Sequence, residues 1–306
     1  MNENLGPRVA ICLAAYNGTP FLREQLDSIL AQRRVEVTVF VSVDRSTDGT
    51  EQWVSEYGVS HPELVLLPTG QRFGGAAQNF FRILCDIDFQ SFEYVAFADQ
   101  DDIWLPGKLA RAIECLKEQS AQGYSSDIIA FWAAGQTRYI RKSYPQRTWD
   151  YYFESAGPGC TFVMQKLLFT ELQQFLRNNH QRLGTVGLHD WLTYAFARAR
   201  GHRWYIDNQA HMMYRQHATN QVGVNAGWAA FLWRVRQVLN GWGLNQARGI
   251  ALLVATPSDP FVAKWIGGGR RAMWNLLRHS WSCRRRPLDR LWFAASCAAL
   301  WVMGWK

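Results

Sequence analysis

The first 120 residues alternate short apolar runs with longer amphipathic segments, and this alternation constrains the fold more than any other feature of the chain. Continuous apolar runs bounded by turn residues are typical of strands buried on both faces, and helices between them favour a parallel sheet. We therefore expect an α/β fold with a Rossmann-like, mostly parallel sheet covered by helices on both faces. The predicted strands span residues 9–15, 35–43, 63–68 and 93–98.

Amphipathic patterns predict a helix after each of these strands. Thr19 and Pro20 are placed like the N-cap and first-turn proline of the first helix. These helices are predicted over residues 21–32, 47–57, 74–87 and 105–119. Weaker signals follow, for strands over 128–135, 159–164 and 210–217 and for helices over 165–176 and 189–201.

Strand signals stop after Gly223, and amphipathic helical patterns such as residues 228–239 replace them. We expect one domain over residues 1–225, followed by a basic, Trp-rich helical region over residues 226–306. The second region holds nine of the fifteen Trp residues. Residues 264–306 hold nine Lys or Arg and one acid, which equals the whole net charge of +8.

A basic, Trp-rich helix suits the headgroup layer of an anionic membrane, and a helical subdomain with basic solvent-facing sides has the same composition. The last apolar run, residues 291–305, would be about 22 Å long as a helix. A bilayer core is ~30 Å thick, so this run is expected to lie on a membrane and not to cross it.

The six Cys residues are scattered without metal-like spacing, which favours buried thiols in a reducing compartment. The N-terminus lacks the basic and apolar segments of a signal peptide, so the first domain is expected in the cytoplasm.

The stretch FADQDDIW places Asp99, Asp101 and Asp102 at the end of a predicted buried strand. In parallel sheets ligands bind beyond the carboxyl ends of the strands. Three neighbouring carboxylates repel one another unless a cation offsets their charge, and Mg²⁺ or Mn²⁺ bound to carboxylates usually also binds phosphates. A helix N-cap is the simpler role for one acid, and Asp102 is placed for it.

Four motifs occur in an order and spacing that resemble the family 2 glycosyltransferases with the GT-A fold. They are AAYNGTPFLREQLDSILAQ at 14–32, VSVDRSTDGT at 41–50, GGAAQNF at 74–80 and ADQDDIW at 98–104. HDW at 189–191 and YRQHATNQVG at 214–223 resemble the bacterial rhamnosyltransferase-like branch of this family. The resemblance implies a nucleotide-binding half over about 8–123 and an acceptor half over about 124–225.

The resemblance also implies roles for residues that bind the nucleotide sugar. Ala15, Tyr16 and Asn17 match the loop that holds the base, and Asp44 matches the acid that hydrogen-bonds a pyrimidine. Val43 and Arg45 depart from the usual pattern around that acid, and Arg45 either contacts a phosphate or faces solvent. The segment that approaches the nucleotide is matched by Arg72, Gly74, Gly75 and Asn79. Asp48 and Gly49 fit a helix cap or turn equally well.

Asp99 and Asp101 match the two acids of the family's DxD motif, which implies that Asp99 binds ribose or metal and that Asp101 binds Mn²⁺ or Mg²⁺. His217 is a candidate third metal ligand or diphosphate contact, with Arg215 and Asn220 as weaker candidates.

Asp190 matches the general base of an inverting transfer, which removes the proton of the attacking acceptor hydroxyl. A carboxylate there also fits a helix N-cap. The implied donor is a dTDP- or UDP-linked sugar, with rhamnose as a candidate. The implied acceptor is a polyprenyl-diphosphate-linked surface glycan such as O-antigen, reached from the cytoplasmic face of a bacterial plasma membrane.

Three other functions compete with this interpretation. An inactive relative that binds a membrane surface is favoured only by the altered surroundings of Asp44. Nucleic-acid binding is disfavoured, because residues 1–225 carry no net positive charge for phosphates. A dinucleotide-dependent dehydrogenase is disfavoured, because no GxGxxG motif follows the first strand.

Overall fold

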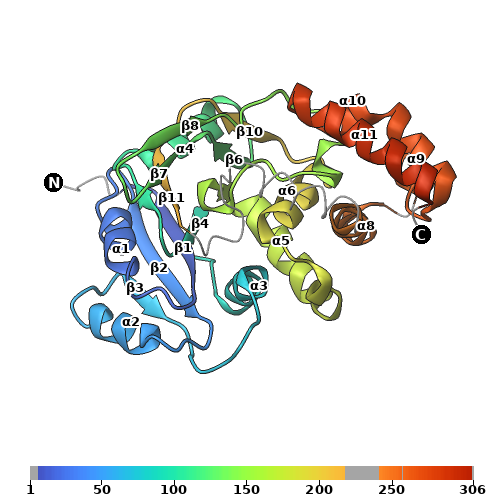
Figure 1. Ribbon diagram of the computed structural model, residues 1–306. Coiled ribbons are helices and arrows are strands. Elements are labelled where there is room, and N and C mark those ends of the chain that lie inside the picture. The colour runs from blue at the N-terminus through green and yellow to red at the C-terminus, as the bar shows by residue number, and fades with distance from the viewer. Residues whose placement is uncertain (1–5, 218–240, 257, 305–306) are drawn as a thin grey trace.

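The computed structural model describes residues 6–217, 241–256 and 258–304, and Figure 1 gives their arrangement. Its main sheet has seven strands in the order β10-β6-β9-β4-β1-β2-β3. All neighbouring strands pair in parallel except β9, which runs antiparallel to β4 and β6. The strands are β1 (Arg8–Ala15), β2 (Glu36–Val43), β3 (Leu64–Leu66), β4 (Tyr94–Asp99), β6 (Gly123–Ser126), β9 (Val163–Gln165) and β10 (Trp204–Asp207). The predicted mostly parallel α/β fold is therefore confirmed.

Helices cover both faces of this sheet, because the side chains of each central strand alternate between two apolar cores. In β1, Val9, Ile11 and Leu13 face one core, whereas Ala10 and Cys12 face the other. The first core is closed by α1 (Leu22–Leu30), α2 (Thr50–Gly58) and α4 (Lys108–Glu118). The second is closed by α3 (Ala76–Asp86), α5 (Lys166–Asn178) and α6 (His189–Ala199).

A second sheet of four strands crosses the end of the first, in the order β5-β11-β7-β8. Its strands are β5 (Ile103–Trp104), β7 (Ile128–Trp132), β8 (Thr137–Ile140) and β11 (Met212–Gln216). The antiparallel pairing of β11 with β5 joins two segments that are more than 100 residues apart in the chain, opposing Met213 to Ile103. This small sheet positions the site described below.

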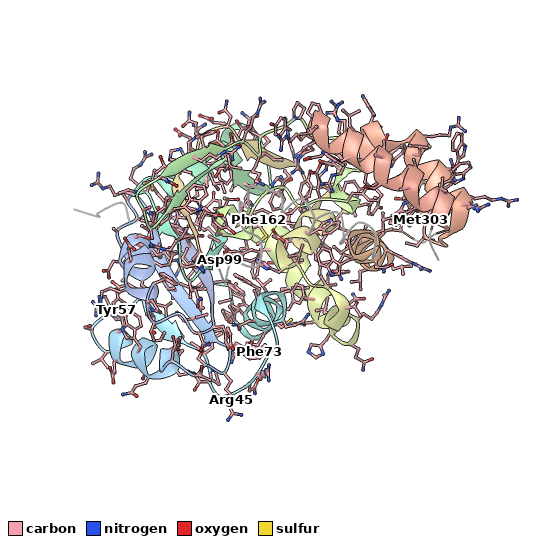
Figure 2. All side chains as sticks on the ribbon, viewed as in Figure 1. Arg45, Tyr57, Phe73, Asp99, Phe162 and Met303 are labelled. Carbon is pink, nitrogen blue, oxygen red and sulfur yellow. The ribbon has the colours of Figure 1, made fainter. Side chains whose placement is uncertain are left out.

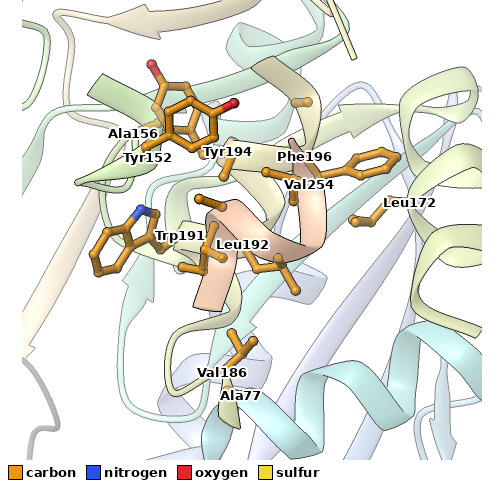
Figure 3. Packing of buried hydrophobic residues seen from close by; sticks show 14 of the residues in the cluster. Ala77, Tyr152, Ala156, Leu172, Val186, Trp191, Leu192, Tyr194, Phe196 and Val254 are labelled. Atoms are coloured by element: carbon orange, nitrogen blue, oxygen red, sulfur yellow. The ribbon is translucent and has the colours of Figure 1, made fainter. Parts of the chain in front are cut away.

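The C-terminal helices pack on the same core as the sheet. α8 (Trp242–Val254), α9 (Gly269–Arg278), α10 (Ser280–Cys283) and α11 (Pro287–Met303) follow in order. Figure 3 shows Val254 of α8 beside Leu192 and Phe196 of α6, within one apolar cluster. Trp265, in the α8–α9 connection, is fully buried against Phe153.

The guanidinium of Arg285, which lies between α10 and α11, is buried as well. It pairs with Asp150 at 3.3 Å, and Asp150 in turn pairs with Arg198 of α6 at 3.3 Å. The C-terminal helices are therefore linked to α6 by a buried ion-pair network as well as by apolar packing.

Most of the predicted elements are present. The four early strands and the helices between them agree within a few residues, and so do β7, α5, α6 and β11. The predicted helix start at Thr19 and Pro20 is wrong. α1 begins at Leu22, because the Thr19 hydroxyl donates instead to Asp48 Oδ2 at 2.8 Å.

Two further differences concern strands. Residues 159–161 form a short 3-10 helix, η2 (Gly159–Thr161), and the strand predicted there begins only at Val163. The sequence did not indicate β5, β6, β8 or β10. The helix predicted over residues 228–239 lies outside the described residues.

Candidate active site

Residues 99–102, which we call the acidic turn, lie at the carboxyl end of β4, in the centre of the main sheet. Asp99 is the last residue of this strand and is opposed to Ala14 near the end of β1. Figure 2 places it in the middle of the molecule, near Phe162. Burial, followed by the charges of Asp101 and Asp190, raises the pKa of Asp99 to about 7. Three acids from two distant motifs are therefore close enough to influence one another.

The small sheet brings His217 to this turn. β11 runs alongside β5, and just beyond its end His217 Nε2 lies 2.6 Å from Asp101 Oδ2. The imidazole also stacks on Phe21 with ring centroids 5.0 Å apart. Arg215 Nε donates to the Asp101 carbonyl at 2.7 Å, and its guanidinium pairs with Glu24. Asp101 and His217, both candidate metal ligands, are thus in contact, whereas Asn220 lies outside the described residues.

Asp102 is not an N-cap, and that prediction is wrong. α4 begins only at Lys108, and the fully buried Asp102 accepts the backbone amide of Arg215 at 3.1 Å. Its neighbours include Lys108, whose ammonium lies 3.4 Å from the centroid of the Trp104 ring. Burial lowers the pKa of Lys108 to about 7. Asp102 therefore holds β11 against the acidic turn.

Asp99, Asp101 and His217 offer the ligand types of a divalent-cation site, and Asp101 and His217 are in contact, but in the described part of the chain these three do not form a group with all ligand atoms within 4.8 Å of one another. Carboxylate oxygens suit Mg²⁺ and Mn²⁺, and an imidazole nitrogen is a common additional ligand. Asp99, Asp102 and Cys160 do have ligand atoms within 4.8 Å of one another. Their chemistry does not suit a metal, because burial raises the pKa of the Cys160 thiol well above its usual range and a metal requires the thiolate.

Asp190 is the second residue of α6, and its carboxylate accepts the backbone amide of Trp191 at 2.7 Å. Burial raises its pKa to about 6, although hydrogen bonds from Trp191 and Ser155 lower it. The positive charge of Lys142 also lowers this pKa. Asp190 is therefore mostly ionised at neutral pH and is able to accept a proton.

Gly159 of η2 lies directly against α6. A Cβ atom on this residue would lie 2.5 Å from His189 Nε2 and 3.2 Å from Asp190 Cβ. The His189 ring is buried and stacks on Phe80 with centroids 3.8 Å apart, and burial lowers its pKa to about 3. Neutral His189 thus packs beside Asp190 as a spacer, and only glycine fits at position 159.

The loop after β1 is fastened to the acidic turn through Gln100. The Gln100 side chain accepts the Tyr16 amide at 2.8 Å and donates to the Tyr16 carbonyl at 3.0 Å. Gly18 allows this contact, since a Cβ there would lie 2.3 Å from Gln100 Oε1. Ala15 is buried at the strand end, while Tyr16 is 54% exposed, so its ring is accessible to a nucleotide base.

Asn17 and Asp48 fasten the same loop to the segment after β2. Asn17 has a positive φ of 48° and accepts the Thr47 amide at 2.8 Å. Asp48 accepts the Thr50 amide at 3.0 Å at the start of α2, as expected for a helix-start residue.

Asp44 lies at the end of β2 and organises the loop before α3. Its two oxygens accept the amides of Phe73 at 2.8 Å and of Gly74 at 3.0 Å. Gly74 and Gly75 have φ angles of 86° and 155°, which only glycine adopts readily. Arg72 is exposed on this loop, and Arg45 is exposed at the rim of the molecule in Figure 2.

A direct nucleotide contact by Asn79 is not supported by its position. Its side chain is only 1% exposed, and its amide donates to the carbonyls of Ser42 at 3.0 Å and Ala15 at 3.4 Å. Asn79 is therefore a positioning residue that joins the ends of β1 and β2.

Sequence reasoning missed several residues of this site: Gly18, Gln100, Lys108, Lys142, Ser155, Gly159 and Cys160. Gln100 lies inside the acidic motif but carries no pattern of its own. Gly18 likewise lies inside the motif at 14–32, and Lys108 lies six residues after Asp102. The remaining four reach the site through contacts between distant segments, which no local signal indicates.

The sequence profile of Glycosyl transferase family 2 matches residues 10–178. A dTDP-rhamnosyl transferase of Shigella flexneri, RfbG, is 40% identical over 281 residues, which cover 92% of this chain and 96% of the relative. The chain belongs to glycosyltransferase family 2. It is a glycosyltransferase of the rhamnosyltransferase-like branch, as the six motifs predicted.

Two further comparisons extend this result. The UDP-Glc:alpha-D-GlcNAc-diphosphoundecaprenol beta-1,3-glucosyltransferase WfgD of Escherichia coli is 27% identical over 163 residues, covering 52% of this chain and 61% of WfgD. The mannosyltransferase PcManGT of Pyrobaculum calidifontis, solved with GDP-Man and Mn²⁺, superposes with a TM-score of 0.56 at 20% identity. That match covers 98% of this chain and 88% of PcManGT, and it supports the predicted GT-A fold.

Proposed function

We propose that this glycosyltransferase moves a sugar, with rhamnose as the first candidate, from a dTDP- or UDP-linked donor to a lipid-linked bacterial surface polysaccharide. The convergence of Asp99, Asp101, His217 and Asp190 at the end of β4 carries the proposal. These residues come from segments that the family resemblance singled out. The charges of Asp101 and Asp190 both raise the pKa of Asp99, and Asp101 is in contact with His217.

Rhamnose is supported by the similarity to RfbG, whose name specifies a dTDP-rhamnosyl donor. A diphosphate-linked lipid acceptor is supported by WfgD, whose name specifies a diphosphoundecaprenol carrier. Mn²⁺ or Mg²⁺ is supported by the carboxylate and imidazole ligand types of Asp99, Asp101 and His217, by the contact between Asp101 and His217, and by PcManGT, which was solved in complex with Mn²⁺.

The nucleobase of the donor would stack on the exposed Tyr16 ring. The loop before α3, which Asp44 holds through the amides of Phe73 and Gly74, would lie beside it. Its diphosphate would lie toward Asp99, Asp101 and His217. A bound divalent ion there would neutralise the charge that develops on the departing diphosphate. Arg72 is exposed on the adjoining loop and is the candidate phosphate contact from the protein.

Asp190 performs the proton transfer in this proposal. An inverting reaction requires it to remove the proton of an acceptor hydroxyl that attacks the sugar on the side opposite the departing diphosphate. Its Oδ1 accepts the Trp191 amide, and in this proposal its carboxylate takes the proton of the acceptor hydroxyl. As the acceptor oxygen bonds to the anomeric carbon, the bond from that carbon to the diphosphate breaks.

Purified protein incubated with dTDP-rhamnose, UDP-glucose or GDP-mannose, Mn²⁺ and a synthetic polyprenyl-diphosphate glycan tests the proposal. We expect transfer from dTDP-rhamnose with inverted anomeric configuration by NMR, and its loss in Asp190→Asn and in Asp101→Ala. Transfer by either variant at the parent's rate would refute the role of that residue. Failure to bind any nucleotide diphosphate would favour the inactive membrane-binding relative.

We also place the protein at the cytoplasmic face of the plasma membrane, as a peripheral protein. Among the described residues, no helix combines the length and hydropathy that a membrane crossing requires. The support for membrane contact comes from the basic, Trp-rich C-terminal helices, and it is tested below.

A further inference from the structure

The solvent-facing side of α11 is apolar along its length. Leu288, Leu291, Ala295, Ala299 and Val302 are all exposed and follow one another at intervals of three or four residues. At about 100° per residue they lie within an arc of about 80°, and we call these five residues the α11 stripe.

The stripe is a true surface feature and not the edge of the core. Cys297 and Leu300 on the opposite side of α11 are buried, whereas Leu291 and Val302 are 55% and 65% exposed. An apolar strip of this length, about 21 Å along the helix, is uncommon on a protein surface that faces only water.

Arginines lie beside the stripe on α9. Arg270, Arg271 and Arg278 are exposed, together with Trp274, and at helical spacing they form one face of that helix. Arg270 donates to the Val302 carbonyl at 3.5 Å, which joins the start of α9 to the end of α11.

The Trp274 ring lies 6.1 Å from that of Trp301, a further contact between the two helices. Both helices lie at one rim of the molecule, where Figure 2 labels Met303. The arginine-bearing face of α9 therefore meets the end of the α11 stripe at Arg270 and Val302.

We propose that the α11 stripe, with the α9 arginines beside it, docks on an anionic phospholipid bilayer with α11 parallel to the membrane plane. Leu and Val side chains would enter the acyl boundary, while arginines and tryptophans occupy the headgroup layer. This assignment rests on the proposed function and deepens it by naming the face that meets the membrane.

Charge decides between a bilayer and a second copy of the chain. Two copies joined through this face would bring their own exposed arginines together, whereas anionic headgroups neutralise them. α11 is 17 residues, about 25 Å, so it is too short to cross a bilayer core of ~30 Å.

Flotation of the full chain with vesicles tests the docking face, using phosphatidylcholine alone or with phosphatidylglycerol and no nucleotide sugar. We expect the parent to bind the anionic vesicles, and L291E/V302E to bind them at least tenfold more weakly. R271E/R278E should lose the preference for anionic vesicles. Leu167→Glu, an equally exposed leucine on α5, is the matched control and should bind as the parent does.

Three outcomes would overturn the proposal. They are no binding by the parent, unchanged binding by L291E/V302E, and a parent dimer without lipid affinity that L291E/V302E converts to monomer. Metal-dependent donor hydrolysis, measured without vesicles, should be the same in the parent and L291E/V302E. A failure of docking and a failure of the proposed chemistry are therefore observed in separate assays.

Discussion

Replacing Gly159 by alanine should disable catalysis while leaving nucleotide binding intact. The added Cβ would lie 2.5 Å from His189 Nε2 and 3.2 Å from Asp190 Cβ. Ordinary contacts between heavy atoms lie near ~3.5–4.0 Å, so the His189 ring must move by about 1 Å. Because that ring is stacked on Phe80, the start of α6 must move with it.

The size of the effect follows from this displacement. A misplacement of about 1 Å in a catalytic group costs about 10²-fold in rate. Overpacking of this kind costs about 1–3 kcal/mol of stability. We therefore expect kcat to fall about 100-fold in Gly159→Ala. KM for the donor should stay nearly constant, because the loops of β1 and β2 that face the donor are untouched.

Gly184→Ala is the matched control. Gly184 also lies in a 3-10 helix, η3 (His180–Thr185), but nothing lies within 4 Å of the Cβ that alanine would add. Steady-state transfer rates, calorimetric affinity for dTDP with Mn²⁺ and urea unfolding would be measured for the parent and both variants. A folded Gly159→Ala protein with kcat within twofold of the parent would refute the contact between η2 and Asp190 as a determinant of catalysis.

The remaining predictions concern charged groups. kcat/KM should rise with pH to a plateau above about pH 6, because Asp190 must be ionised to act as base; a profile flat down to pH 5 would argue against it. Since burial raises that pKa, the ionised carboxylate destabilises the fold, and Asp190→Asn should be more stable than the parent above pH 6 but not below about pH 4. Arg285→Met should lower the free energy of unfolding by about 3 kcal/mol in urea titrations, since Asp150 stays buried with only Arg198 and Tyr194 as partners. That loss should shrink as pH falls, because burial raises the pKa of Asp150 and protonation removes its charge. Asp101→Ala and His217→Ala should each weaken Mn²⁺ binding at least about tenfold by calorimetry, and unchanged binding would exclude that side chain as a ligand.

The strands of the nucleotide-binding half were predictable because they are buried on both faces. Residues 9–15 and 93–98 are continuous apolar runs, and such runs carry their own signal. The missed strands β6 and β10 have mixed sequences, GYSS and WYID, and they form only because β10 pairs with β6 and β6 pairs with β9. Such elements depend on tertiary contacts and not on local propensity.

The candidate site likewise contains residues that local sequence indicates and residues that it does not. Asp99, Asp101 and Asp190 were predicted as site residues because the motifs that contain them are local. The role of Asp102 was wrong because it depends on β11, whose Arg215 amide it accepts from 113 residues away. The burial of Asn79 likewise follows from contacts with two strand ends. Local sequence thus indicated candidate residues for the chemistry but not how the fold holds them.

The structure also changes how the C-terminal region should be tested. Removing residues 226–306 would remove Trp265 from the core beside Phe153 and would leave Asp150 without Arg285. The Arg285 guanidinium also donates to the Ser155 carbonyl, and the Ser155 hydroxyl lowers the pKa of Asp190. A deletion would therefore perturb Asp190, the proposed base, together with any membrane contact. Substitutions confined to the α11 stripe, which leave the buried side of the helix intact, separate the two effects.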